Sequence, residues 1–101
     1  MLLVIDVGNT NMVFGAMDDF EVKHRWRIST ESRTTDEMGL LLLQLLKHKG
    51  LTQQDIKGAC ISCVVPSLLY TVEKACRRYL KLDPLVVGKG VRTGMRVRTD
   101  N

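Results

Sequence analysis

The sequence of 101 residues has little of what marks secreted, disulfide-rich or membrane-spanning proteins. It has three cysteines, an odd number typical of a reducing compartment rather than of a domain held by disulfides. No apolar run approaches the roughly 18 residues of a membrane span, and the N-terminus lacks the basic region of a cleaved signal peptide. We therefore expect a cytoplasmic protein without a membrane partner.

Aromatic residues are also scarce, with one Trp, two Tyr and two Phe. The formal net charge of +4 and the pI of about 9.2 would suit anionic partners such as nucleotides, phosphates or nucleic acid. Charged side chains on a solvated surface, without an anionic partner, would give the same net charge and pI. Because no aromatic residue is interleaved with the basic stretches, base stacking has little support and we do not expect a nucleic-acid partner.

Two of the cysteines, Cys60 and Cys63, form a C-x-x-C pattern that invites a redox or metal interpretation. Redox pairs of this type open a helix, whereas this pair lies in "ACISCVV", which has the composition of a strand. Alternation along a strand places the two thiols on opposite faces. A zinc site would need further ligands, and none stands at a standard spacing. We predict packed, unreactive thiols; a thiol redox or metal module is the alternative, and it would lose its function if both were serine.

The apolar periodicity predicts a β-β-β-α-β-α-β order. The expected strands are residues 2–5, 12–16, 21–28, 59–65 and 85–87. One helix starts at the capping box Thr34-x-x-Glu37 and ends by Gly50, a short turn follows from Thr52, and a second helix starts at Pro66. In the third strand, the alternation places Val22, His24, Trp26 and Ile28 on one face.

Three antiparallel strands followed by two crossovers are the ribonuclease-H-like layout, an α/β fold with a mixed sheet. We expect residues 1–101 to form one nucleotide-binding domain of this kind. The sequence ends in a basic, glycine-rich stretch with no closing helix, so we expect the N-terminal portion of a longer protein.

The first expected strand is followed by Asp6-Val7-Gly8-Asn9-Thr10. An Asp before such a turn is often only a hairpin residue whose carboxylate accepts hydrogen bonds from nearby backbone N–H groups. We favour a ligand site, because a carboxylate at the end of a buried strand is costly unless a cation compensates it. Gly8 lets the backbone approach a ligand, and Asn9 and Thr10 add donors for phosphate oxygens. The pattern suits magnesium-bound phosphates over a β-hairpin, with Asp6 as a metal-water ligand rather than a general base.

Five segments in order resemble the N-terminal half of a type III pantothenate kinase. They are "LLVIDVGNTNMVFG", "RWRIST", "DEMGLLLLQLL", "ISCVVPSL" and "LVVGKGVRTGMRVRTDN". The resemblance implies transfer of the γ-phosphate of ATP to pantothenate, the first step of coenzyme A biosynthesis. It also implies magnesium, a monovalent cation such as potassium or ammonium, and a homodimer of the full-length protein.

The resemblance implies an ATP-phosphate site with Asp6 directed at magnesium, formed by Asp6, Val7, Gly8, Asn9, Thr10, Asn11, Met12 and Val13. Thr99 stands where many members carry a Tyr at the pantothenate pocket. The catalytic Asp of the family lies in a G-A-D-R motif that residues 1–101 do not contain, and we expect this motif beyond Asn101. We therefore expect no catalytic residue and no kinase activity in this segment alone. A non-catalytic nucleotide-binding or transcriptional regulatory protein of the same fold is the alternative.

Overall fold

The computed structural model describes residues 1–87. Two expectations therefore lie outside the described residues: the place of Thr99 near pantothenate, and the catalytic motif expected beyond Asn101. The predicted order of strands and helices is confirmed. The elements are β1 (Leu2–Val7), β2 (Asn11–Asp18), β3 (Glu21–Ser29), α1 (Thr35–His48), η1 (Gln53–Asp55), β4 (Gly58–Cys63), α2 (Pro66–Ala75), η2 (Cys76–Leu80) and β5 (Leu85–Val87). No helix within residues 1–87 is long and apolar enough to cross a bilayer.

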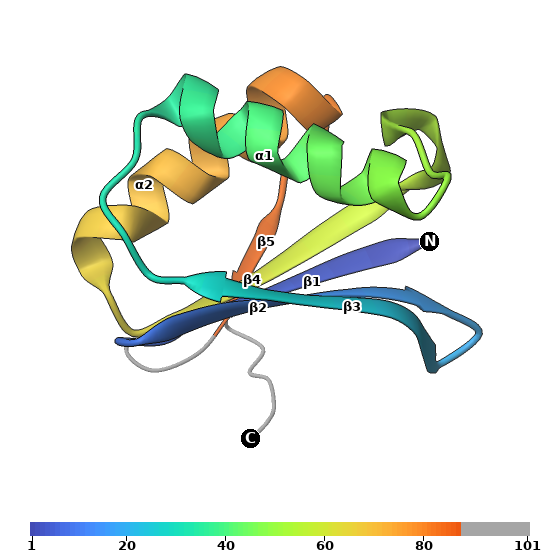
Figure 1. The fold of residues 1–101 in the computed structure, drawn as a ribbon, viewed down its shortest axis with the longest axis horizontal. Helices are drawn as coiled ribbons and strands as arrows, with labels where there is room; N and C mark the ends of the chain where they lie inside the picture. Colours follow the sequence, from blue (N-terminus) through green and yellow to red (C-terminus); the bar gives the residue numbers. More distant parts are fainter. Residues whose placement is uncertain (88–101) are drawn as a thin grey trace.

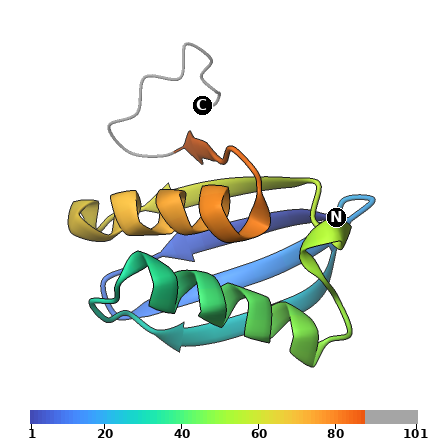
Figure 2. The same cartoon turned by 90° about the horizontal axis from the view of Figure 1, so that it is seen from above.

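The five strands form one mixed sheet in the order β3-β2-β1-β4-β5. β1 pairs antiparallel with β2 and parallel with β4, while β2–β3 is antiparallel and β4–β5 is parallel. β1 is therefore the central strand. Both helices lie on one face of the sheet (Figures 1 and 2). This is the predicted ribonuclease-H-like layout of a meander followed by two crossovers.

The ends of the helices follow the sequence signals. Thr34 Oγ1 accepts a 3.1 Å hydrogen bond from the Glu37 backbone N–H, and Glu37 Oε1 accepts one of 2.8 Å from the Thr34 N–H. Gly50 adopts φ 75°, a left-handed conformation that ends α1 and favours glycine. Pro66 is the first residue of α2. Each of these local predictions is confirmed.

The core lies between the sheet and the two helices. Alternate residues of the strands face the helices and are buried, and they pack against the apolar stripes of α1 and α2. The fully buried large side chains are Phe14, Leu3, Ile5, Met12, Met38, Leu42, Leu46, Ile61, Val7, Val72 and Cys76. The other face of the sheet, which we call the open face, carries exposed and half-buried residues and no helix of the described chain.

Several strand bounds and the orientation of one side chain differ from the sequence prediction. β1 continues to Val7, and β4 ends at Cys63 because the next residues turn into α2. Val22 was expected on the face of Trp26, but the β2–β3 register shifts between Ala16 and Met17 and pairs Val22 with Met17. That irregularity turns Val22 to the open face, where the residue is 56% exposed.

Candidate functional site

Residues 8–10 connect β1 to β2 and are held by the chain that follows β3. The Gly8 N–H donates a 2.9 Å hydrogen bond to the Asn11 carbonyl. Thr30 contributes two further bonds: its N–H donates to the Thr10 carbonyl at 2.9 Å, and its hydroxyl donates to the Gly8 carbonyl at 2.7 Å. These three hydrogen bonds hold the hairpin turn against the segment that follows β3.

Position 8 favours glycine because the backbone of Asn11 lies close to it, and not because its φ is left-handed. A Cβ built on Gly8 would lie 3.1 Å from the carbonyl oxygen of Asn11, which is tighter than most real contacts. A larger residue would push the turn open. Gly8 therefore keeps this turn compact, while the sequence argument that it lets the backbone approach a ligand stays a prediction.

Asp6 lies one residue before the end of β1, and its side chain is exposed on the open face. Its strand partners are Val13 of β2 and Ser62 of β4. The prediction that burial makes this carboxylate costly is therefore wrong, because the helices cover only the opposite face. Asp6 is available to a ligand for a simpler reason: it is a charged group on the central strand, two residues from the turn.

The other predicted site residues differ in how far the structure exposes them. Asn9 and Thr10 are exposed, and within residues 1–87 neither side chain is engaged in a hydrogen bond. Val7 and Met12 are buried in the core and paired in the sheet, so their side chains are not available to a ligand. Asn11 and Val13, which complete the predicted set, are half-buried.

Strand pairing adds a residue that the sequence interpretation left unassigned. Arg27 of β3 is paired with Val13, and Val13 is paired with Asp6. Paired residues share a face, so the exposed Arg27 and Asp6 lie in one row on the open face, two strands or about 10 Å apart. The sequence alone could have shown this relationship only if the register of β1, β2 and β3 had been known.

The donor set around Asp6 fits a magnesium ion held mainly by phosphates and water. Among residues 1–87 no cluster of three or more His, Cys, Asp or Glu side chains can hold a metal. Magnesium commonly binds proteins through one or two carboxylates while substrate phosphates and water supply its other ligands. One exposed carboxylate beside a compact turn matches that arrangement and does not match a resident structural metal.

The C-x-x-C thiols lie on opposite faces of β4, as predicted from alternation. Cys60 shares the open face with Ser62, and burial raises the pKa of its thiol. Cys63 lies on the helix side, where its Sγ donates to the Val65 carbonyl at 3.1 Å. A reactive cysteine needs a lowered pKa and a nearby partner. The geometry therefore gives this pair a packing role.

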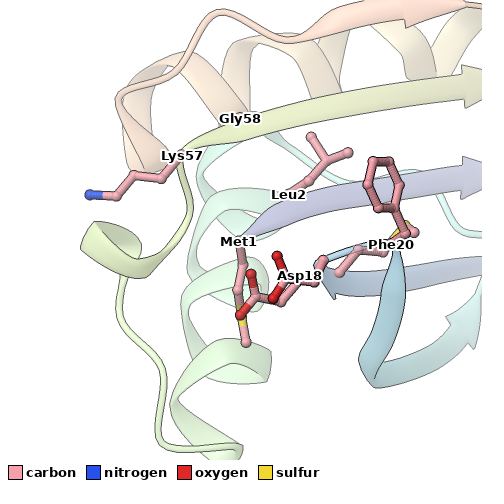
Figure 3. Close-up of a pocket in the computed structure, with 8 residues that line it drawn as sticks. Met1, Leu2, Asp18, Phe20, Lys57 and Gly58 are labelled. Carbon is pink, nitrogen blue, oxygen red and sulfur yellow. The ribbon is translucent and has the colours of Figure 1, made fainter.

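Two cavities lie at opposite ends of the sheet. One of about 240 Å³ lies beside the hairpin, between the segment after β3 and the first turns of α2. Another of about 520 Å³ lies at the far end, where Leu2, Asp18, Phe20 and Lys57 surround it (Figure 3). The second cavity contains none of the residues predicted for the phosphate site.

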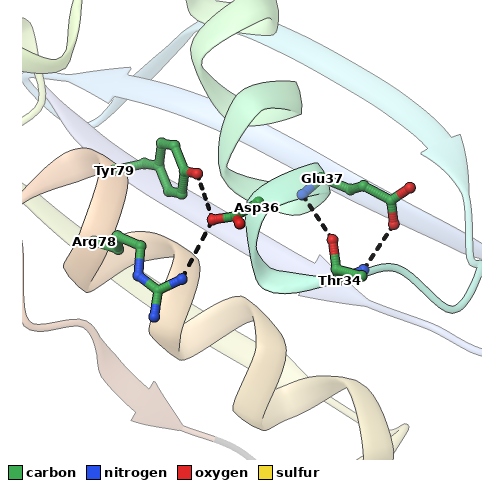
Figure 4. A network of polar contacts seen from close by, with 5 residues as sticks. All are labelled: Thr34, Asp36, Glu37, Arg78 and Tyr79. Atoms are coloured by element: carbon green, nitrogen blue, oxygen red, sulfur yellow. Dashed lines mark hydrogen bonds and ion pairs between the residues drawn. The ribbon is translucent and has the colours of Figure 1, made fainter.

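A polar network joins the start of α1 to η2 (Figure 4). Tyr79 donates its hydroxyl to Asp36 Oδ1 at 2.5 Å, and Arg78 Nη1 donates to the same oxygen at 3.3 Å. The hydrogen bond from Tyr79, and next that from Arg78, lowers the pKa of Asp36. The hydrogen bond to Asp36 raises the pKa of Tyr79. The network therefore links the first turn of α1 to η2.

Comparison with solved structures shows the fold. The chain is similar to a protein from Porphyromonas gingivalis provisionally assigned as an N-acetylglucosamine kinase, with a TM-score of 0.63 and 17% sequence identity. The match covers 87% of this chain and 34% of that one, so this chain spans about a third of the length of its structural relative. The type III pantothenate kinase family model matches residues 2–101. The chain therefore belongs to the type III pantothenate kinase family.

Proposed function

We propose that this chain provides the ATP-phosphate site of a pantothenate kinase, which phosphorylates pantothenate in the first step of coenzyme A biosynthesis. The observation that carries the proposal is the hairpin turn braced by Thr30, which leaves Asn9 and Thr10 exposed beside the carboxylate of Asp6. Membership of the family supports the choice of pantothenate as the acceptor.

In this mechanism the residues of the chain bind and orient. The exposed backbone and side-chain donors of Asn9 and Thr10 hold phosphate oxygens, and Asp6 orients the water ligands of the metal. Arg27, in the same row as Asp6, neutralises phosphate charge from β3. Magnesium, when bound, supplies charge neutralisation for phosphoryl transfer. The rigid turn contributes because phosphoryl transfer depends mainly on positioning.

The remaining roles are proposed from the family. Potassium or ammonium serves as a monovalent cation, the full-length protein is a homodimer, and Thr99 lies near pantothenate. The general base belongs to a motif that the sequence up to Asn101 does not contain. We therefore expect magnesium-dependent ATP binding by this chain and no turnover.

Calorimetric titration with ATP and magnesium tests the proposal. Asp6→Asn keeps the size of the side chain and removes its charge, so ATP affinity should fall at least tenfold while the fold is retained. Asp18→Asn is the matched control, because Asp18 is an exposed carboxylate at the far end of β2. Equal ATP affinity in the two variants would reject the phosphate site.

A further inference from the structure

The outer edge of β3 pairs with no other strand of residues 1–87. β3 forms one border of the sheet, and only β2 pairs with it (Figure 2). The Thr30 N–H donates to the Thr10 carbonyl, so the even-numbered residues from Trp26 to Thr30 direct their backbone groups toward β2. The backbone N–H and C=O groups of Arg25 and Arg27 therefore point away from the sheet, where another strand could pair with them.

This stretch of edge, residues 24–28, is closed at both ends, and we call it the β3 edge. At one end the Ser29 carbonyl accepts a 3.3 Å hydrogen bond from Arg33 Nη1. At the other end the register of the β2–β3 pair shifts between Ala16 and Met17. Such irregularities bend and twist a strand. The β3 edge therefore has room for a strand of about five residues, which is an ordinary strand length.

The side chains of the β3 edge differ between its two faces. Arg25 and Arg27 are exposed on the open face, and no ion pair joins either of them to a carboxylate of residues 1–87. On the helix side, Trp26 is buried and its neighbours His24 and Ile28 are half-buried. A strand added here would therefore meet two positive charges on one face and a mostly covered surface on the other.

A second copy of β3 is a poor match for this edge. Antiparallel pairing of two copies about Trp26 would place Arg25 of each copy opposite Arg27 of the other. Like charges directly opposite each other destabilise a sheet, and charged side chains on edge strands commonly prevent self-association. The same two charges would stabilise a strand that carries carboxylates, because opposite charges across a sheet attract.

We infer that the β3 edge binds an extended acidic segment of another protein, which adds a strand to the sheet beside β3. Strand addition takes its affinity from backbone hydrogen bonds and its specificity from alternate side chains. Acidic residues at alternate positions lie near Arg25 and Arg27, whose guanidinium groups suit carboxylates. The intervening residues are apolar, since they lie on the side of the half-buried Ile28. This interaction is separate from the proposed kinase role of the hairpin turn.

Fluorescence titrations with short peptides test the inference. Trp26 is the one tryptophan of the sequence and lies on the β3 edge, so it reports on binding there. The first probe is a seven-residue peptide of alternating glutamate and valine, and the second has lysine in place of glutamate. The glutamate peptide should bind saturably and at least tenfold more tightly than the lysine peptide.

Two further peptides separate strand addition from simple charge attraction. Both have the sequence of the glutamate peptide, with N-methyl groups on the backbone of either all glutamates or all valines. Only alternate N–H groups of an added strand face its neighbour, so one of the two should bind at least tenfold more weakly than the other. With the unmodified peptide bound, hydrogen exchange followed by NMR should slow at least tenfold at the amides of Arg25 and Arg27.

Arg25→Gln should weaken the glutamate peptide about threefold to tenfold, because it removes one charge from the edge. Arg25→Glu should reverse the preference, so that the lysine peptide binds more tightly. Arg77→Gln is the matched control, because Arg77 is an exposed arginine paired with Asp83 beyond η2. This control should leave the affinity for both peptides unchanged.

Four results would overturn the inference. They are absence of saturable binding by the glutamate peptide, equal affinity for the glutamate and lysine peptides, equal affinity for the two N-methylated peptides, and unchanged exchange at Arg25 and Arg27. An oligothymidylate that binds more tightly than the glutamate peptide would also overturn it, in favour of a nucleic-acid partner. Asp6→Asn should leave peptide affinity unchanged, so failure of the phosphate site and failure of the β3 edge are distinguishable.

Discussion

Gly39 of α1 lies against the aromatic ring of Tyr79, so that a Cβ built on Gly39 would overlap Tyr79 Cδ1. The ring cannot move away freely, because its hydroxyl is bonded to Asp36. Gly39 is buried in the middle of a helix, a place where glycine is otherwise unfavourable. The absence of a side chain at this position is therefore what allows α1 and η2 to pack closely.

Gly39→Ala should destabilise the protein by about 1–3 kcal/mol, as overpacking does, although alanine favours helices by up to about 1 kcal/mol over glycine. In a Tyr79→Ala background the obstruction is gone, and the same substitution should be neutral or stabilising. Urea unfolding of the four proteins measures both effects. An equal loss of stability in the two backgrounds would show that the ring of Tyr79 is not the cause.

Thr30→Val should loosen the turn while keeping the shape of the side chain. The hydroxyl bond to Gly8 is lost, and the backbone bond from Thr30 to Thr10 remains. We expect a loss of about 0.5–1.5 kcal/mol in unfolding free energy and a twofold to tenfold weaker affinity for ATP with magnesium. Thr52→Val, at the start of η1 away from the hairpin, is the control and should cost stability without weakening ATP. A Thr30→Val protein with unchanged ATP affinity would show that the hydrogen bond from Thr30 to Gly8 has no role in ATP binding.

The buried thiol of Cys76 should make the free energy of unfolding fall at alkaline pH. Burial raises the pKa of its thiol from 9.0 to about 12. The folded state therefore keeps the thiol protonated while the unfolded chain ionises it above pH 9, so stability is complete below pH 9 and falls as pH rises toward 12. The slope from this one group is about 1.4 kcal/mol per pH unit.

Unfolding free energies of the wild type and Cys76→Ala, measured across this range, isolate the thiol. The hydrogen bond that raises the pKa of Tyr79 acts in the same direction, and it is present in both proteins. The difference between the two proteins should therefore shrink or change sign as pH rises. A difference that stays constant with pH would contradict the assignment to Cys76.

Replacement of Cys60 and Cys63 by serine should cost less than about 2 kcal/mol of stability and leave ATP binding unchanged, since these thiols pack on opposite faces of β4. Chemical unfolding and calorimetry measure the two quantities. Loss of ligand binding in a protein that remains folded would favour the redox or metal alternative.

The parts of the fold that were predicted correctly depend on local chemistry. The capping box at Thr34, the left-handed Gly50 and Pro66 at the start of α2 each act within a few residues, so the sequence contains the whole signal. The placement of Cys60 and Cys63 on opposite faces followed from alternation along one strand.

The errors concern properties that no local pattern determines. The burial of Asp6 was overestimated because it depends on which face of the sheet both helices cover. Val22 was placed on the wrong face because an irregularity in the β2–β3 pairing reverses the alternation. Arg27 and Thr30 were not assigned to the site because their proximity to it follows from strand register and from the course of the loop after β3.

The phosphate site at the β1–β2 hairpin is tested most directly by following backbone amides by NMR while ATP is added with and without magnesium. We expect saturable, magnesium-dependent shifts concentrated at Gly8, Asn9 and Thr10, and their loss in a folded Asp6→Asn variant. Shifts that appear instead around the cavity of about 520 Å³ at the far end of the sheet, or that persist unchanged in Asp6→Asn, would contradict it.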